Sequence, residues 1–194
     1  CPGCAGCGIV SPERPTVLVE GDRYDTSIAA TIIQAKWDHH MPVYRQQDLF
    51  AGSGWTPARS TLLNIIASAC FVLAPLFEHM KRKVQSDIGV GIEGDRKNWR
   101  LIEKIREARA SGATSLLAKM WVYSGLSEAK YNIVDFRVSR HRDGPDEFFA
   151  GSQCLVQGDC FSGNLSVVIH SDDRLKFVAC WGHARRKLVE AQTY

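Results

Sequence analysis

Apolar positions recur at helical spacing in the first half of the chain and at strand spacing in much of the second half. Asp25 is a typical N-cap for the first apolar run, Pro42 precedes the next, and Thr56 with Pro57 reads as an N-cap followed by a proline in the first helical turn. The pattern therefore predicts three helices, over Thr26–His39, Val43–Ala51 and Pro57–Lys83.

A short glycine turn, Gly52–Gly54, separates the second predicted helix from the third. Helix, tight turn and helix is the outline of a DNA-binding helix-turn-helix. It is equally the outline of an ordinary helical hairpin, and the residues alone leave both interpretations open.

Beyond Lys83 the pattern changes to short apolar runs separated by turn residues, which favours strands. Strands in series with flanking helices predict an α/β or α+β core. The predicted strands are Ile88–Ile92, Ala118–Tyr123, Tyr131–Val138, Cys154–Gln157, Ser166–Ile169 and Phe177–Cys180, and the predicted helices are Arg96–Ala110 and His183–Glu190.

The composition is that of a globular protein, with 45% hydrophobic and 23% charged residues among 194. Polar residues and Pro75 interrupt the longest apolar stretch, Leu62–Phe77, so no membrane span is expected. Four of the seven cysteines are isolated among apolar neighbours, which favours a reducing cytoplasm. Because the chain starts at Cys1 and its final helix runs to the last residues, it reads as a piece of a longer protein.

Cys1, Cys4 and Cys7 form two overlapping Cys-x-x-Cys pairs among glycines. Such a turn places two thiolates beside a zinc ion, but a closed structural zinc site needs four ligands. The spacing predicts half of a Zn²⁺ site, and the alternative is a glycine-rich terminus without metal.

Two of the predicted strands each end in an acid, Glu93 after Ile88–Ile92 and Asp159 after Cys154–Gln157. If these strands are neighbours, the two carboxylates converge, and paired carboxylates hold the Mg²⁺ ions of phosphodiester chemistry. Strands also often end in an acid that only makes a turn. The sequence thus predicts a two-metal Mg²⁺ site as one of two interpretations.

Basic residues are clustered around these acids although the formal net charge is only +3. Arginine suits phosphate because its planar guanidinium donates two parallel hydrogen bonds. Each cluster alone could be a solvated face, but the three together favour a polyanionic partner such as DNA. The clusters are Lys81–Lys83; Arg137, Arg140, His141 and Arg142; and Arg185, Arg186 and Lys187.

Five stretches resemble the insertion-sequence-66 family of bacterial transposases, in order and over nearly the whole chain. They are His40–Gln47, Gly54–Leu62, Ser139–Asp146, Gly158–Gly163 and Cys180–Lys187. The resemblance implies a zinc-binding segment followed by a ribonuclease-H-like catalytic core that uses Asp, Asp and Glu with two Mg²⁺ ions.

By this resemblance Cys1 and Cys4 correspond to the second half of the family's zinc site, and Asp159 to the second catalytic aspartate. His183, Arg185, Arg186 and Lys187 correspond to the basic segment after it, and Arg140 and Arg142 are expected to contact DNA as well.

The chain also departs from the family pattern. Glu93 is the best match for the first acid, with Asp87 and Asp95 as alternatives, and the helix expected from Arg96 arrives as if a neighbouring strand were deleted. Glu190 is too close to His183 to be the catalytic glutamate. Asn164 stands where the family often has an aromatic residue.

These observations predict a domain plan of a partial zinc segment (1–24), a helical region (25–84) and a truncated ribonuclease-H-like core (85–194). The expected function is DNA transposition, with DNA as partner, no membrane, a homo-oligomer on DNA and a place in the cytoplasm at the nucleoid. The alternatives are a DNA-binding protein without catalysis and an unstable remnant of a transposase.

Overall fold

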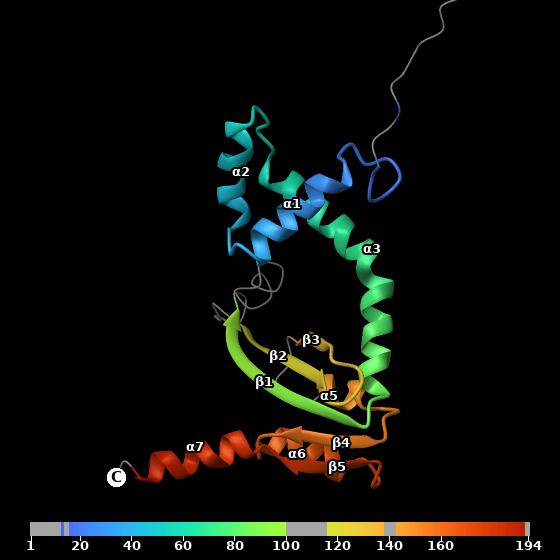
Figure 1. Cartoon of the computed structure of the whole chain (residues 1–194), viewed down its shortest axis with the longest axis vertical. Helices are drawn as coiled ribbons and strands as arrows, with labels where there is room; N and C mark the ends of the chain where they lie inside the picture. The colour runs from blue at the N-terminus through green and yellow to red at the C-terminus, as the bar shows by residue number, and fades with distance from the viewer. Residues whose placement is uncertain (1–12, 14–15, 100–115, 138–142, 193–194) are drawn as a thin grey trace, which may run out of the picture. The chain divides into compact units, whose positions relative to one another are not determined.

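The computed structural model describes residues 13, 16–99, 116–137 and 143–192. The chain divides into two compact units, Cys1–Pro75 and Leu76–Tyr194 (Figure 1). The first unit is helical and the second contains a five-stranded mixed sheet with helices. The α/β class expected from the sequence is confirmed.

The helical unit contains α1 (Thr26–Trp37), α2 (Val43–Gly52) and the first part of α3 (Arg59–Gln85). Asp25 caps α1 as predicted, since its carboxylate accepts a hydrogen bond from the Ser27 N–H at 2.8 Å. Apolar side chains from all three helices form the core, together with partly buried aromatic side chains beside it. The buried members are Ala29, Ile32, Val43, Leu62 and Ile65.

The third helix begins later than the sequence predicts. Thr56 is not its N-cap, because α3 begins at Arg59 and the first bond toward it runs from the Leu62 N–H to the Ala58 carbonyl. The Pro57 carbonyl instead accepts a hydrogen bond from the Gln47 side chain at 2.9 Å, which holds the preceding residues outside the helix.

At 27 residues, α3 is long and apolar enough to cross a membrane by length and composition alone. The polar residues and Pro75 within the stretch Leu62–Phe77 do not prevent α3 from meeting this criterion. Core helices of soluble proteins meet the same criterion, so the expected absence of a membrane span stays a prediction.

The sheet of the second unit has the order β3-β2-β1-β4-β5. Strands β1, β2 and β3 form an antiparallel meander, whereas β4 pairs in parallel with β1 and β5 in parallel with β4. Only β2 therefore runs against the other four strands. The strands are β1 (Gly89–Trp99), β2 (Leu116–Gly125), β3 (Asn132–Arg137), β4 (Cys154–Gly158) and β5 (Leu175–Ala179).

The prediction of a helix starting at Arg96 is wrong, because this part of the chain belongs to strand β1. It continues to Trp99 and pairs with β2 from Val90 opposite Gly125 to Trp99 opposite Leu116. Ten cross-strand pairs outweigh the helical spacing of apolar residues in this segment. The expectation that a neighbouring strand is missing is therefore wrong, because β2 is that strand. The rest of the predicted helix lies outside the described residues.

One face of the sheet carries the core of this unit. Its apolar side chains from β1, β2 and β4 contact the end of α3, α5 (Asp143–Phe148) and α6 (Ser162–Ile169). The predicted strand Ser166–Ile169 is wrong: this run forms the second half of α6, which buries Asn164 and Val167 at helical spacing. After β5 the chain enters α7 (Trp181–Gln192), which buries none of its residues.

Candidate functional site

The two acids singled out in the sequence lie beside each other's strands at the carboxyl end of β4, but the prediction that a strand ends at Glu93 is wrong, because β1 continues past Glu93 to Trp99. Parallel pairing of β1 with β4 ends at Ile92 opposite Gly158, and Glu93 and Asp159 are the next residues of the two strands. Ile92 is buried in the core, so Glu93 projects from the opposite face of the sheet. Both acids line one cavity of about 550 Å³, together with Asp95.

Strand β2 supplies an apolar wall to this cavity. Met120 and Val122 stand opposite Asp95 and Glu93 in the antiparallel register, and both line the cavity. Their positions follow from the alternation of side chains on β2, whose intervening Trp121 is buried in the core. The carboxylates therefore share a hollow whose wall is partly apolar.

Basic residues reach the same cavity from the first turns of α7. His183 and Arg186 line it, whereas Arg185 lies exposed on the helix. Lys187 is also exposed and forms an ion pair with Glu190 at 2.8 Å. Two of the four predicted DNA-contacting residues on this helix are thus placed beside the acids.

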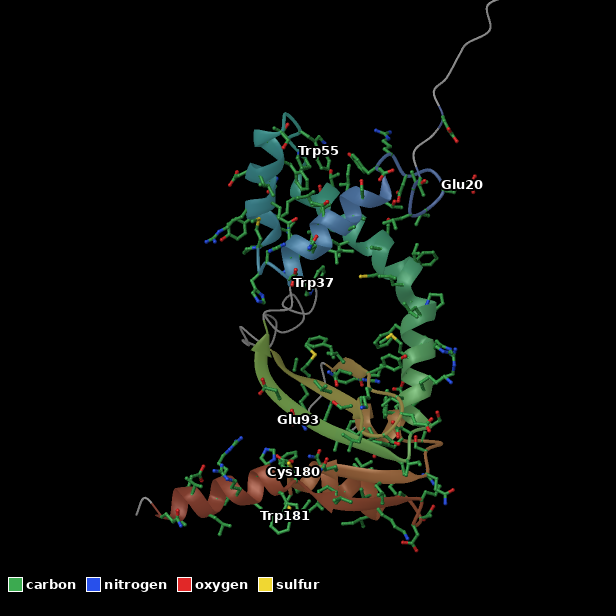
Figure 2. The ribbon with its side chains drawn as sticks, in the orientation of Figure 1. Glu20, Trp37, Trp55, Glu93, Cys180 and Trp181 are labelled. Atoms are coloured by element: carbon green, nitrogen blue, oxygen red, sulfur yellow. The ribbon has the colours of Figure 1, made fainter. Side chains whose placement is uncertain are left out.

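Cys180 lies immediately before α7 and lines the cavity as well. In Figure 2, Cys180 lies on the side of this segment nearer Glu93, and the Trp181 side chain extends away from it. A hydrogen bond with the His183 side chain, and others from the backbone N–H groups of His183 and Gly182, hold the pKa of the Cys180 thiol below its usual value. By contrast, burial and the charge of Asp87 raise the pKa of Cys154 to about 11.

Asp87, one alternative for the first acid, lies away from this cavity. It precedes β1 at the opposite end of the strand, is 7% exposed, and accepts hydrogen bonds from the backbone N–H groups of Gly89, Ser127 and Ala129 at 3.1–3.3 Å. Burial opposes its ionisation, but these hydrogen bonds outweigh burial and hold its pKa below the usual value. Its geometry is that of a structural carboxylate, which leaves Glu93 and Asp95 beside Asp159.

The basic cluster after β3 is only partly described. Arg137 forms ion pairs with Asp135 at 2.9 Å and Glu147 at 2.8 Å, so it ties β3 to α5. These bonds raise the pKa of Arg137 and lower that of Glu147. Arg140 and Arg142 lie outside the described residues.

The donor types of the cavity suit a hard cation. Mg²⁺ prefers oxygen ligands and is often held by only one or two carboxylates, with waters and substrate phosphates completing its shell. Within the described parts of the chain, no three His, Cys, Asp or Glu side chains form a group that could hold a metal ion. Glu93 and Asp159 therefore fit Mg²⁺ as an incomplete site; Cys1 and Cys4 lie outside the described residues.

One residue of the site was not expected from the sequence. Asn164, in the first turn of α6, donates a hydrogen bond from Nδ2 to Oδ1 of Asp159 at 2.7 Å. Its sequence position, five residues after an acid, gave no sign of this contact, because it depends on the chain turning from β4 into α6. The sequence showed only that an aromatic residue was replaced there.

The chain is similar to known proteins over most of its length. The family profile described as "Transposase IS66 family" matches residues 21–194. The chain is 25% identical to the uncharacterized protein y4jD of Sinorhizobium fredii (strain NBRC 101917 / NGR234) over 96% of its own length and 37% of the relative's. It is also 25% identical to the uncharacterized protein y4hP of the same organism, over 84% of its length and 29% of the relative's.

No solved structure matches the chain. The chain spans about a third of the length of the curated relatives it matches. The family profile covers most of the chain, including all eleven helices and strands described above. The chain therefore belongs to the IS66 family of transposases.

Proposed function

We propose that this chain is part of a DNA transposase whose second unit is a ribonuclease-H-like core. The strand order β3-β2-β1-β4-β5, with only β2 reversed, supports that fold. The observation that carries the function is the shared cavity of Glu93, Asp159 and Arg186 at the carboxyl end of β4. Two acids beside a guanidinium suit a metal-dependent reaction on a phosphodiester.

In this proposal each group has a separate task. Glu93 and Asp159 hold Mg²⁺, with Asp95 as a further acid of the same cavity, and Arg186 binds a non-bridging phosphate oxygen through its planar fork. The apolar wall of Met120 and Val122 limits water beside the phosphate. Bound Mg²⁺ would act as a Lewis acid that polarises a phosphoryl oxygen, and it would lower the pKa of its bound water.

The proposed overall reaction has two steps. Water attacks a phosphodiester at the end of the element and the 3′-oxygen leaves, which frees a 3′-hydroxyl. That hydroxyl then attacks a phosphodiester of the target strand and displaces the 3′-oxygen of the target, which leaves as a new 3′-hydroxyl. We propose that the chain acts in the cytoplasm on nucleoid DNA, as an oligomer that holds both ends of the element.

The helical unit and the N-terminal segment are assigned to binding. We propose that α2 and α3, joined by the turn at Gly54, contact DNA, because Arg45 and Arg59 are exposed on these helices. Cys1 and Cys4 are proposed as half of a Zn²⁺ site. The proposed plan keeps the zinc segment at 1–24, the helical region at 25–84 and the core at 85–194.

Nicking of supercoiled plasmid DNA in Mn²⁺ or Mg²⁺ tests the catalytic proposal. The purified chain should nick the plasmid, Asp159→Asn should abolish nicking, and Glu128→Gln, which removes an exposed acid that does not line the cavity, should leave the rate unchanged. Nicking that persists in Asp159→Asn would assign the activity to a contaminating nuclease and overturn the proposal.

A second function, DNA binding without cleavage, is favoured by the lack of a third metal-binding side chain among the described residues. It predicts binding that survives Asp159→Asn but weakens in Arg185→Gln/Arg186→Gln. If both arginines contact phosphates, the slope of log K against log salt should fall by about 2, because each neutralised phosphate contributes about 0.9. An unchanged slope would place the DNA-contacting surface elsewhere.

A further inference from the structure

Asn164 is a buried polar residue that directs its amide at a proposed metal ligand. It is 2% exposed, and its Nδ2 lies 2.7 Å from Oδ1 of Asp159. The same oxygen accepts the backbone N–H of Phe161 at 3.3 Å. Oδ1 of Asp159 is therefore occupied by two donors from the turn that leads into α6.

The amide of Asn164 is held in place by its surroundings. At Gly158 a Cβ atom would lie 2.9 Å from Cγ2 of Ile92 and 3.4 Å from Nδ2 of Asn164, so the glycine gives the amide room to approach. Turning the amide over would bring its oxygen against the carboxylate oxygen of Asp159, which selects the observed orientation.

These contacts distinguish the two oxygens of the Asp159 carboxylate, because only Oδ1 accepts the hydrogen bonds from Asn164 and Phe161. We propose that Asn164 is a positioning residue: it holds Oδ1 of Asp159 and thereby presents Oδ2 as the oxygen that binds the cation. This inference rests on the proposed function, since it assumes that Asp159 binds Mg²⁺. A ligand oxygen whose carboxylate is fixed by a neighbour loses less side-chain freedom on binding the metal, and removing such a neighbour typically costs 10–100-fold in metal affinity.

Calorimetric titration of Mn²⁺ into the purified chain tests the inference. Asn164→Leu keeps the buried volume but has no N–H, and Asn164→Ala serves if the leucine variant does not fold. Both should bind Mn²⁺ about tenfold or more weakly than the unaltered chain. The matched control is Val167→Ala, which disturbs the same helix and the same core without touching Asp159; it should melt at a lower temperature and bind Mn²⁺ with unchanged affinity.

The outcomes separate this inference from the function on which it rests. Weaker binding in the Asn164 variants, with normal binding in Val167→Ala, supports the positioning role. Tight binding in a folded Asn164 variant, or equal weakening in Val167→Ala, overturns it and leaves the metal site intact. If the unaltered chain binds no Mn²⁺, or Asp159→Asn binds it normally, the proposed metal site fails and the role of Asn164 fails with it.

Discussion

Replacing Asp87 with asparagine removes a charge from a buried carboxylate that joins two turns of the sheet unit. Its Oδ1 accepts the Gly89 N–H, while its Oδ2 accepts the N–H groups of Ser127 and Ala129 from the turn between β2 and β3. An asparagine has one acceptor oxygen, so its NH₂ group must face at least one of these donors.

The loss of stability expected for Asp87→Asn follows from the kind of hydrogen bond that is lost. Hydrogen bonds to a charged partner contribute about 1.5–3 kcal/mol each, so losing one and weakening the others should destabilise the unit by about 3 kcal/mol. For a domain of this size that corresponds to a melting temperature lower by about 10 °C. Thermal melts followed by circular dichroism measure the shift. Glu128→Gln, an exposed acid of the same turn, is the control and should melt within about 1 °C of the unaltered chain.

The pH dependence gives this prediction a second test. Because the pKa of Asp87 is lower in the folded chain than in the unfolded chain, its contribution is complete above the unfolded pKa of about 3.9 and is lost as the pH falls through the folded pKa. The difference in stability between the unaltered chain and Asp87→Asn should be largest near pH 7 and should become smaller toward pH 2. A gap that is absent at pH 7, or that stays constant down to pH 2, would refute this account of the three hydrogen bonds.

Two further predictions concern a glycine and a thiol. Gly125→Ala should destabilise the sheet unit by about 3 kcal/mol or more in urea unfolding, because its Cβ would collide with the Ala129 backbone carbonyl. The control Gly151→Ala, with open space around it, should change stability by less than about 0.5 kcal/mol. Cys180 should react with iodoacetamide at neutral pH faster than an ordinary exposed thiol, since the pKa of its thiol is lowered. His183→Ala should move the midpoint of the rate–pH profile of Cys180 upward. An unchanged midpoint would exclude the His183 hydrogen bond as the cause of the lowered pKa.

Helices and strands were predicted well where local pattern and tertiary pairing agree, and poorly where they conflict. The residues from Arg96 onward have helical spacing, yet pairing with β2 extends β1 to Trp99. The β-branched residues near Val167 suggested a strand, but burial at helical spacing places them in α6. In both cases the deciding contact is distant in sequence and leaves no local signal.

The candidate site shows the same division. Both acids were visible in the sequence, and the neighbouring strands β1 and β4 place them in one cavity, although only Asp159 follows the end of a strand and Glu93 lies within β1. Placing Asp87 away from the cavity required the register of β1 and the backbone donors around Asp87, and Glu93 and Asp95 both remain candidates for the first acid. The contact of Asn164 with Asp159 could not have been found in the sequence, because it depends on the turn between β4 and α6.

The parallel pairing of β1 with β4 has a consequence for the order of folding. Strands β1, β2 and β3 follow one another along the chain as an antiparallel meander, so they can pair before β4 has been made. Glu93, however, meets Asp159 only after β4 has been made and a long loop has been closed, which carries a larger entropic cost. Cation binding at the proposed site would therefore require the pairing of β1 with β4, and a folding intermediate that contains only the meander would lack it.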